Sequence, residues 1–396
     1  MENLKSKIKA LAKAYLADIT GIRRHIHANP ELSTREFETA AFVASKLTEM
    51  GIPFQEGVAE TGIVALIEGK NPSHKTIALR ADMDALPIFE ENEVSYKSKN
   101  EGVMHACGHD AHTASLLGAA RILKAMREDF EGTIKLFFQP SEERYPGGAI
   151  RMIKAGAMEN PRPAHVFGQH VYPELEAGKV GMRSGEYMAS TDEVFLTIRG
   201  KGGHAAQPMN VIDPILIASH IIVALQQIVS RNASPTVPTV LSFGRIIGEG
   251  RTNVIPDKVI VEGTIRTFDE SWRKQAHQKI TKMAQSIAEG MGGSCEVFID
   301  SGYPFVYNDP EITAKTKDWA IEFLGKENVV DLPLRMTAED FSYFAREVPS
   351  CFYRLGVRNE ERGIISNLHT ATFDVDEKSL ETGMGLMAWI AINAVR

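Results

Sequence analysis

The spacing of apolar residues predicts alternating helices and strands over most of the chain. From Leu4 to Ile22, apolar side chains recur every three to four residues, which is the period of a helix with one buried face, and this helix should end before Pro30. Residues 33–36, Ser-Thr-Arg-Glu, have the pattern of a capping box. They predict a second helix that ends at Gly51.

Further along, apolar runs at residues 62–68 and 76–82 predict strands, the second apolar enough to lie inside a sheet. A helix is predicted at 113–126 and another strand at 132–138. This strand-helix-strand order favours a parallel sheet. One more strand is expected at 164–173. The first part of the chain therefore predicts an α/β fold, with a mostly parallel sheet flanked by helices.

The pattern changes after about residue 190. The predicted elements are, in order, a strand at 194–199, a helix at 212–229, strands at 239–247 and 258–267, a helix at 270–289 and a strand at 294–300. This β-α-β-β-α-β order is that of a ferredoxin-like unit. Helix-strand alternation returns after residue 312 and could complete the first sheet. We therefore predict a discontinuous domain, residues 1–184 and 300–396, with a second domain inserted at 185–299.

Composition narrows the possible partners and the compartment. The 396 residues, 43% of them hydrophobic, are enough for two domains, and 44 basic against 51 acidic residues give a net charge of -7. With no dense Lys/Arg run, this balance argues against a nucleic-acid partner. The three cysteines, Cys107, Cys295 and Cys351, suit a reducing compartment, so the protein is predicted to be cytoplasmic. The polar N-terminus and the lack of a run of ~18 apolar residues predict neither export nor a membrane span.

The strongest chemical signal is the segment 104–112, which holds a thiol, three imidazoles and a carboxylate and follows the predicted strand at 76–82. Cys107 and His109 are two residues apart, so in an extended segment or a loop both side chains can face one point. A thiolate with an imidazole binds Zn²⁺ or a related transition ion. Taken alone, the pair is equally well interpreted as a small buried Cys and a hydrogen-bonded His.

Other predicted strand exits supply more candidates. A carboxylate pair follows the strand at 132–138, an imidazole ends the strand at 164–173, and another lies in the C-terminal tail; such groups collect at the carboxyl ends of parallel strands. The candidate ligands are Cys107, His109, Glu143, His170 and His369. Five ligands exceed what one tetrahedral ion needs, so two divalent cations sharing a ligand are predicted. Glu142 would take a proton from water and return it to a leaving nitrogen, although adjacent carboxylates are more often a solvated surface pair.

Five segments carry a family resemblance. They read R-A-D-M-D-A-L-P, H-A-C-G-H-D-A-H, Q-P-S-E-E, G-K-G-G-H-A-A-Q-P and L-H-T. In this order they resemble the metal-dependent amidohydrolases that include hippurate hydrolase, bacterial N-acyl-amino-acid amidohydrolases and plant auxin-conjugate hydrolases, within the aminoacylase and carboxypeptidase G metallopeptidases. The resemblance spans nearly the whole chain. It implies a two-metal catalytic domain and an inserted lid domain through which two subunits form a homodimer.

The resemblance also implies roles for single residues. The five candidate ligands match the family's metal ligands, and the spare glutamate matches its general acid/base. Asp82 matches a carboxylate that orients the site from behind the ligands, and His204 matches a lid histidine that steadies the oxyanion in the partner's active site. Asn253 and Arg266 match residues that hold the substrate's carboxylate. The family commonly has a second histidine where this chain has Met209, so no role is assigned to that imidazole.

The predicted reaction is the hydrolysis of an N-acyl-L-amino acid, hippurate-like or N-acetylated, to a carboxylic acid and a free amino acid. A dipeptidase or carboxypeptidase would use the same chemistry on a longer amide. A catalytically silent metal-binding scaffold is a third hypothesis, which the retention of Glu142 and every ligand disfavours. The acyl group, the amino acid and the metal, whether Mn, Zn, Co or Ni, stay open.

Overall fold

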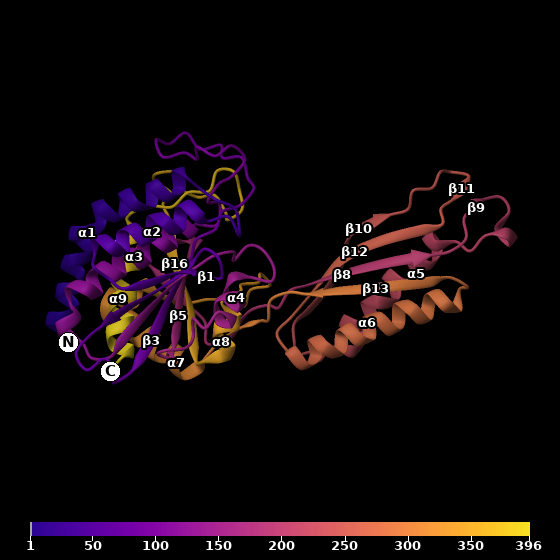
Figure 1. Cartoon of the computed structure of the whole chain (residues 1–396). Coiled ribbons are helices and arrows are strands. Elements are labelled where there is room, and N and C mark those ends of the chain that lie inside the picture. The colour runs from indigo at the N-terminus through magenta and orange to yellow at the C-terminus, as the bar shows by residue number, and fades with distance from the viewer. Residues whose placement is uncertain (1) are drawn as a thin grey trace. The chain divides into compact units, whose positions relative to one another are not determined.

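The computed structural model describes residues 2–396 (Figure 1), and the chain divides into two compact units. Unit 1 comprises Met1–Tyr187, Tyr307–Leu334 and Asp340–Arg396, and unit 2 comprises Met188–Val306 and Arg335–Glu339. Each unit has its own hydrophobic core, because the two clusters of buried apolar residues belong to different units.

Unit 1 is built on an eight-stranded sheet with the order β1-β2-β4-β3-β5-β16-β6-β15. The strands are β1 (Phe54–Val58), β2 (Gly62–Glu68), β3 (Thr76–Asp82), β4 (Thr133–Gln139), β5 (Val166–Glu176), β6 (Val180–Met182), β15 (Val329–Asp331) and β16 (Ser350–Arg358). The central strands β4, β3, β5 and β16 are parallel to one another. A separate two-stranded sheet pairs β7 (Gly185–Met188) with β14 (Val306–Asn308). The predicted α/β class with a mostly parallel sheet is confirmed.

Helices cover both faces of this sheet. They are α1 (Glu2–Ala28), α2 (Phe37–Glu49), α3 (His109–Ala125), α4 (Gly148–Lys154), α7 (Pro310–Leu324), α8 (Ser342–Glu347) and α9 (Ser379–Ala394), with short 3-10 turns η1 (Arg127–Asp129) and η4 (Lys326–Asn328). In Figure 1, α1, α2, α3 and α9 lie on one side of the sheet and α4 and α8 on the other. Every residue of β3 and β4 is therefore buried, which explains why most of their residues are apolar.

Two predicted helix starts in unit 1 are wrong. The second helix begins at Phe37 without any side-chain cap, because Thr34 has a φ of 69° and the Glu36 carboxylate accepts hydrogen bonds from other elements. The helix expected from residue 113 begins at His109, four residues earlier. The predicted end of the second helix is confirmed, since Gly51 follows it with a φ of 60°.

Unit 2 has the predicted ferredoxin-like order. Its elements are β8 (Asp192–Arg199), β9 (Gly203–His204), η2 (Pro208–Asn210), α5 (Pro214–Gln227), η3 (Ile228–Asn232), β10 (Thr239–Ile247), β11 (Val254–Ile255), β12 (Lys258–Thr267), α6 (Glu270–Gly290) and β13 (Ser294–Ser301). The antiparallel sheet has the order β10-β12-β8-β13, and α5 and α6 pack against each other and on that sheet. β9 and β11 form a separate two-stranded sheet.

One stretch of unit 2, Pro214–Asn232, is long and apolar enough to cross a membrane by length and composition alone, with a mean hydropathy of 1.3. The apolar pattern of the sequence predicts no such segment. Core helices of soluble proteins pass the same test, and one face of this helix, with Ile217, Ile221 and Leu225, is buried in the core of unit 2.

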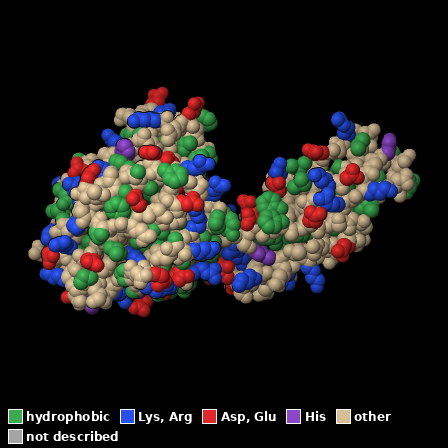
Figure 2. All heavy atoms as spheres, in the orientation of Figure 1, with side chains coloured by type: hydrophobic (Ala, Val, Ile, Leu, Met, Phe, Trp, Pro, Cys, Tyr) green, Lys and Arg blue, Asp and Glu red, His purple; other side chains and the backbone are tan. Residues whose placement is uncertain are grey.

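Charged side chains of both signs lie on the surface of the molecule. On the face of the molecule that Figure 2 shows, blue basic and red acidic side chains are interspersed.

Candidate metal centre

The carboxyl ends of the central parallel strands bring the candidate ligands together. Asp82 ends β3 and lies opposite Gln139, which ends β4, so the carboxylate pair that follows β4 leaves the sheet beside the end of β3. His170 lies two residues beyond Gly168, whose partner on β3 is Arg80, so His170 is level with the end of β3. The prediction that His170 ends its strand is wrong, because β5 continues to Glu176.

Gly108 sets the turn between two of the ligands. It has a φ of 82° and is the N-cap residue of α3, so Cys107 lies before the helix and His109 is its first residue. A Cβ on Gly108 would lie 2.5 Å from a Val171 side-chain carbon. Only glycine fits both this backbone conformation and this close approach.

The ligand atoms form two groups that share the thiol. Cys107 Sγ lies 3.4 Å from Nε2 of both His170 and His369, and His369 Nε2 lies 3.2 Å from Glu143 Oε1. Among the described residues, Cys107, His109 and His170 make one group whose ligand atoms lie within 4.8 Å of one another, and Cys107, Glu143 and His369 make another. Two neighbouring cation positions with a shared sulfur fit these groups.

Hydrogen bonds fix the ring orientation of His109 and His170, so that each imidazole can bind a cation. His109 Nδ1 lies 2.8 Å from the Asp84 carbonyl and His170 Nδ1 lies 2.8 Å from the Val171 carbonyl, so each Nδ1 donates and each Nε2 lone pair is left for a ligand. Among the described residues, His109 Nε2 is buried and has no hydrogen-bond partner, and the buried Glu143 Oε1 makes no hydrogen bond although His369 Nε2 lies 3.2 Å away. Such orphaned atoms are rare in native proteins and fit a bound metal ion.

The carboxylates around the cluster also favour the binding of a positive ion. Burial, followed by Glu143 and Glu142, raises the pKa of the Cys107 thiol well above its ordinary value. Burial opposes protonation of His109, but nearby carboxylates raise its pKa to about 10. A bound divalent cation would displace both protons, because it favours thiolate and neutral imidazole.

His369 reaches the cluster from a separate loop. Its backbone N–H donates to the Ala106 carbonyl at 2.8 Å, which docks the loop beside Cys107. Its φ of 60° is in the left-handed region, and its side chain is 53% exposed. The most exposed candidate ligand is therefore held by backbone contact rather than by burial.

A network of buried hydrogen bonds lies next to the candidate ligands. Asp82 accepts from Arg80 at 2.6 Å and from His112 Nδ1 at 2.5 Å, and His112 Nε2 accepts the Val171 N–H at 2.8 Å. Burial alone would raise the pKa of Asp82, but Arg80 and two imidazoles hold it well below its usual range. Sequence reasoning had assigned no role to His112, although its spacing of three from His109 places both on one helix face.

Unit 2 brings two of its three predicted site residues together. His204 on β9 pairs with Val254 on β11, and the Ala205 N–H donates to the Asn253 carbonyl at 3.0 Å. His204 and Asn253 are both exposed. Arg266 is not near them, because it lies close to the far end of β12. His204 Nδ1 accepts the Ala206 N–H at 3.1 Å, so the ring proton is on Nε2.

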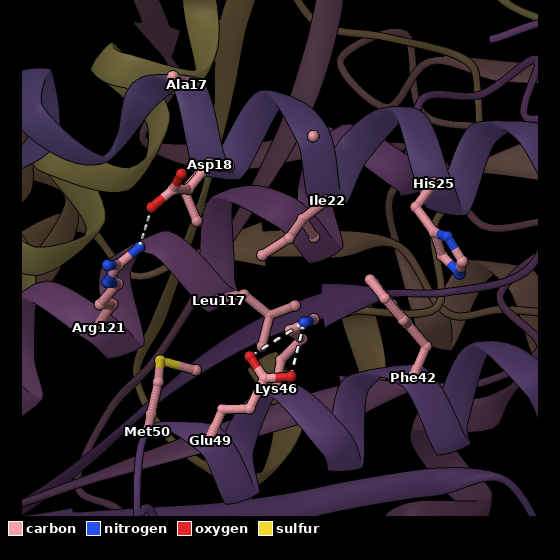
Figure 3. A pocket seen from close by; sticks show the side chains of 12 residues that line it. Ala17, Asp18, Ile22, His25, Phe42, Lys46, Glu49, Met50, Leu117 and Arg121 are labelled. Carbon is pink, nitrogen blue, oxygen red and sulfur yellow. Dashed lines mark hydrogen bonds and ion pairs between the residues drawn. The ribbon is translucent and has the colours of Figure 1, made fainter.

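A cavity of about 670 Å³ lies elsewhere in unit 1, among α1, α2 and α3 (Figure 3). Its charged groups pair with one another, Arg121 with Asp18 at 2.8 Å and Lys46 with Glu49 at 2.7 Å. None of its lining residues belongs to the metal cluster. This cavity is therefore separate from the reaction site.

The fold and the thiol-imidazole-carboxylate cluster define a metal-dependent hydrolase. The chain belongs to Peptidase family M20/M25/M40, whose sequence model matches residues 78–393, and so acts on amide bonds. The family resemblance predicted from the sequence is confirmed.

Similar proteins match from 78% to 99% of the chain. An N-acyl-L-amino acid amidohydrolase of Geobacillus stearothermophilus is 44% identical over 307 residues, 78% of this chain and 82% of that protein. Thermostable carboxypeptidase 2 of Saccharolobus solfataricus is 41% identical over 396 residues, 99% of this chain and 98% of that protein. The crystal structure of Bacillus subtilis YxeP, a dinuclear metal-binding peptidase of the M20 family, matches with a TM-score of 0.82 and 32% identity, covering 97% of this chain and 99% of that one.

Proposed function

We propose that this enzyme hydrolyses the amide bond of an N-acyl-L-amino acid, releasing a carboxylic acid and a free amino acid. The observation that carries the proposal is the pair of ligand groups sharing Cys107, with the buried Glu142 carboxylate 4.0 Å from His109 Nε2. The N-acyl-L-amino acid amidohydrolase among the relatives supports the substrate class. A carboxypeptidase activity is the second candidate, which the relative from Saccharolobus solfataricus favours.

The chain's ligands would hold two divalent cations, Mn, Zn, Co or Ni. Cys107 would be shared, His109 and His170 would complete one position, and Glu143 and His369 the other. When bound, the cations supply the positive charge that polarises the amide carbonyl and lowers the pKa of a water. Asp82 would keep the ligands oriented through its hydrogen-bonded imidazole neighbour.

Glu142 and His204 would carry out the proton and charge steps. Glu142 accepts the proton of the attacking water and then donates it to the leaving nitrogen. His204 Nε2, which carries the ring proton, donates to the oxyanion that forms on the amide carbon. Both the acid/base and the oxyanion donor are then side chains of this chain.

The distance between Asn253 and Arg266 within one unit 2 favours a site that two subunits share. If Asn253 and Arg266 both hold the substrate's carboxylate, a single unit 2 cannot supply both. The nine residues of β12 from Lys258 to Arg266 alone span roughly 26 Å at the rise of a β-strand. We therefore propose a homodimer in which Arg266 comes from one subunit, and Asn253 with His204 from the other.

The exposed apolar side chains of unit 2 fit such a dimer. Leu216 and Val223, 51% and 74% exposed, lie seven residues apart on the solvent face of α5. Val240 and Ile246 are also exposed, on the edge strand β10. Large apolar side chains exposed together on one helix face are candidates for an interaction site.

The double variant Leu216→Asp/Val223→Asp is expected to be monomeric, because burying two carboxylates in a dimer interface is strongly unfavourable. Light scattering after size-exclusion chromatography measures the mass. Phe89→Asp, at an apolar residue of unit 1 that is 67% exposed, is the matched control and should leave the mass unchanged. A dimeric double variant would contradict an interface through this face of α5.

Substrate panels test the reaction itself. Purified enzyme is assayed on N-acetyl-amino acids, N-benzoyl-amino acids and dipeptides, with Mn²⁺, Co²⁺, Ni²⁺ and Zn²⁺ in turn. We expect the highest kcat/KM on an N-acyl-amino acid. A preference for dipeptides would favour the carboxypeptidase activity, and no turnover on any amide would favour a silent scaffold.

Cys107→Ala is expected to lose bound metal, because it removes the thiolate common to both ligand groups. Metal analysis after dialysis gives the stoichiometry, and readdition of each cation tests recovery. Cys295→Ala, at a buried cysteine of unit 2, is the matched control and should bind metal like the parent. Full stoichiometry and activity in Cys107→Ala would mean that Cys107 is only a small buried residue.

We also propose a cytoplasmic location. All three cysteines are free, which suits a reducing compartment.

A further inference from the structure

The carboxylate pair is held in place by two other carboxylates. The N–H of Ser141 donates to Glu36 Oε1 at 2.8 Å. The N–H groups of Glu142 and Glu143 donate to the two carboxylate oxygens of Asp84 at 3.0 and 2.9 Å. Three consecutive peptide groups next to the metal cluster are thus fixed from outside it.

Ser141 is the strained member of this segment. Its φ of 56° is in the left-handed region, which residues with a side chain rarely adopt and keep only where the surroundings enforce it. Glu36 Oε1 accepts from the Ser141 hydroxyl at 3.2 Å as well as from its N–H, and that hydroxyl accepts the Thr34 N–H at 2.8 Å. The enforcing contacts therefore converge on Glu36.

Glu36 is fully buried and is paired with neutral donors only. Besides Ser141, its carboxylate accepts from the Thr34 N–H at 3.0 Å and from the Thr61 hydroxyl at 2.8 Å. Within residues 2–396 it makes no ion pair, and burial, followed by the charge of Asp84, raises its pKa. A buried carboxylate without a cation is unfavourable for folding, so stability alone does not account for it.

We propose that Glu36 is a positioning residue for the hydrolysis. It holds Ser141 in the left-handed turn and so fixes the direction in which the chain presents Glu142 to the water and to the leaving nitrogen. This inference rests on the proposed role of Glu142. Asp84 holds the N–H groups of both Glu142 and Glu143, and Glu143 is one residue further from the strained turn at Ser141, so cation binding should persist when Glu36 is replaced.

Glu36→Ala is expected to lower kcat roughly 10- to 100-fold, the usual effect of losing a group that orients a site, with KM and metal content little changed. Glu36→Gln keeps an oxygen that accepts the Ser141 N–H, while the Thr61 hydroxyl can turn to accept from the amide. It should therefore restore most of kcat. If Glu36→Ala does not fold, Glu36→Asp, which withdraws the carboxylate by one methylene, gives the same test.

Leu47→Ala is the matched control for stability, because Leu47 is fully buried in α2, the helix that follows Glu36. It should lower Tm without lowering kcat. If Glu36→Ala also lowers Tm and keeps kcat, the carboxylate is only structural and the proposal is overturned.

The double variant Glu36→Ala/Glu142→Gln shows whether Glu36 acts through Glu142. If it does, the double variant has the kcat of Glu142→Gln, because the group that Glu36 positions has already lost its function. An equal further loss in both backgrounds would overturn the positioning role and leave the proposed reaction intact. A Glu142→Gln variant with normal kcat would instead refute the proposed role of Glu142 itself.

Discussion

Glu142→Gln is expected to lower kcat at least ~10²-fold while both cations stay bound, since general acid/base groups contribute this much or more. An amide has nearly the shape of a carboxylate but neither accepts the proton of water nor returns it to nitrogen. Glu142 is only 6% exposed, so the substitution changes its chemistry within the same packing. Steady-state kinetics with metal analysis of the same sample measures both quantities.

Glu143→Gln is the matched control, because it makes the same chemical change one residue away. Glu143 Oε1 is the atom near His369 Nε2, so this variant should lose metal as well as kcat. The two neighbours are thereby separated by metal content. Near-normal kcat in fully metal-loaded Glu142→Gln would place the base elsewhere.

Local signals in the sequence predicted four of the eight strands in the sheet of unit 1, namely β2, β3, β4 and β5. The residues of β2 and β3 coincide with the predicted strands at 62–68 and 76–82, because these strands are covered on both faces and consist of apolar runs. The two long helices and the four-stranded sheet of unit 2 were also predicted within a few residues, whereas the short strands β9 and β11 were not. The period of apolar residues and the turn residues are sufficient to predict an element whose structure is determined by residues close to it in the sequence.

Long-range contacts explain what the sequence did not predict. The pattern of residues 33–36 is that of a capping box, yet Glu36 bonds to Thr61 and Ser141, which lie 25 and 105 residues away. Likewise the N–H that His112 accepts belongs to Val171, 59 residues away. No local period encodes such partners, so the groups that support the site were found only in the structure.

The candidate ligands were easier to predict than their supports. Metal ligands are mostly Cys, His, Asp or Glu and, in α/β sheets, collect near the carboxyl ends of the strands, which restricts them to a few motifs. A supporting group can be any hydrogen-bonding residue, as the buried Arg80 beside Asp82 illustrates. Ligand chemistry therefore restricts which residues of the sequence can bind metal, whereas the residues that support them can be identified only from the fold.

His204→Ala is expected to fold, dimerise and bind metal normally, yet to lose roughly 10²-fold or more in kcat, as removal of one oxyanion donor does. His204 is exposed on the two-stranded sheet of unit 2, so its removal leaves no buried cavity. Unchanged Tm and metal content would assign the loss to catalysis. Met209→Ala, at an 80% exposed residue five positions further along the chain, is the control and should keep kcat.

Mixing His204→Ala with Glu142→Gln tests whether the site is shared. In a mixed dimer of the proposed kind, the site of the His204→Ala subunit receives an intact His204 from its partner and keeps its own Glu142, whereas the other site carries both defects. Random exchange at equal amounts should restore about a quarter of the parent activity per subunit, because half of the dimers are mixed and each has one intact site. If mass spectrometry verifies exchange and the mixture stays as inactive as its parts, each subunit uses its own His204 or none, and the shared site is wrong.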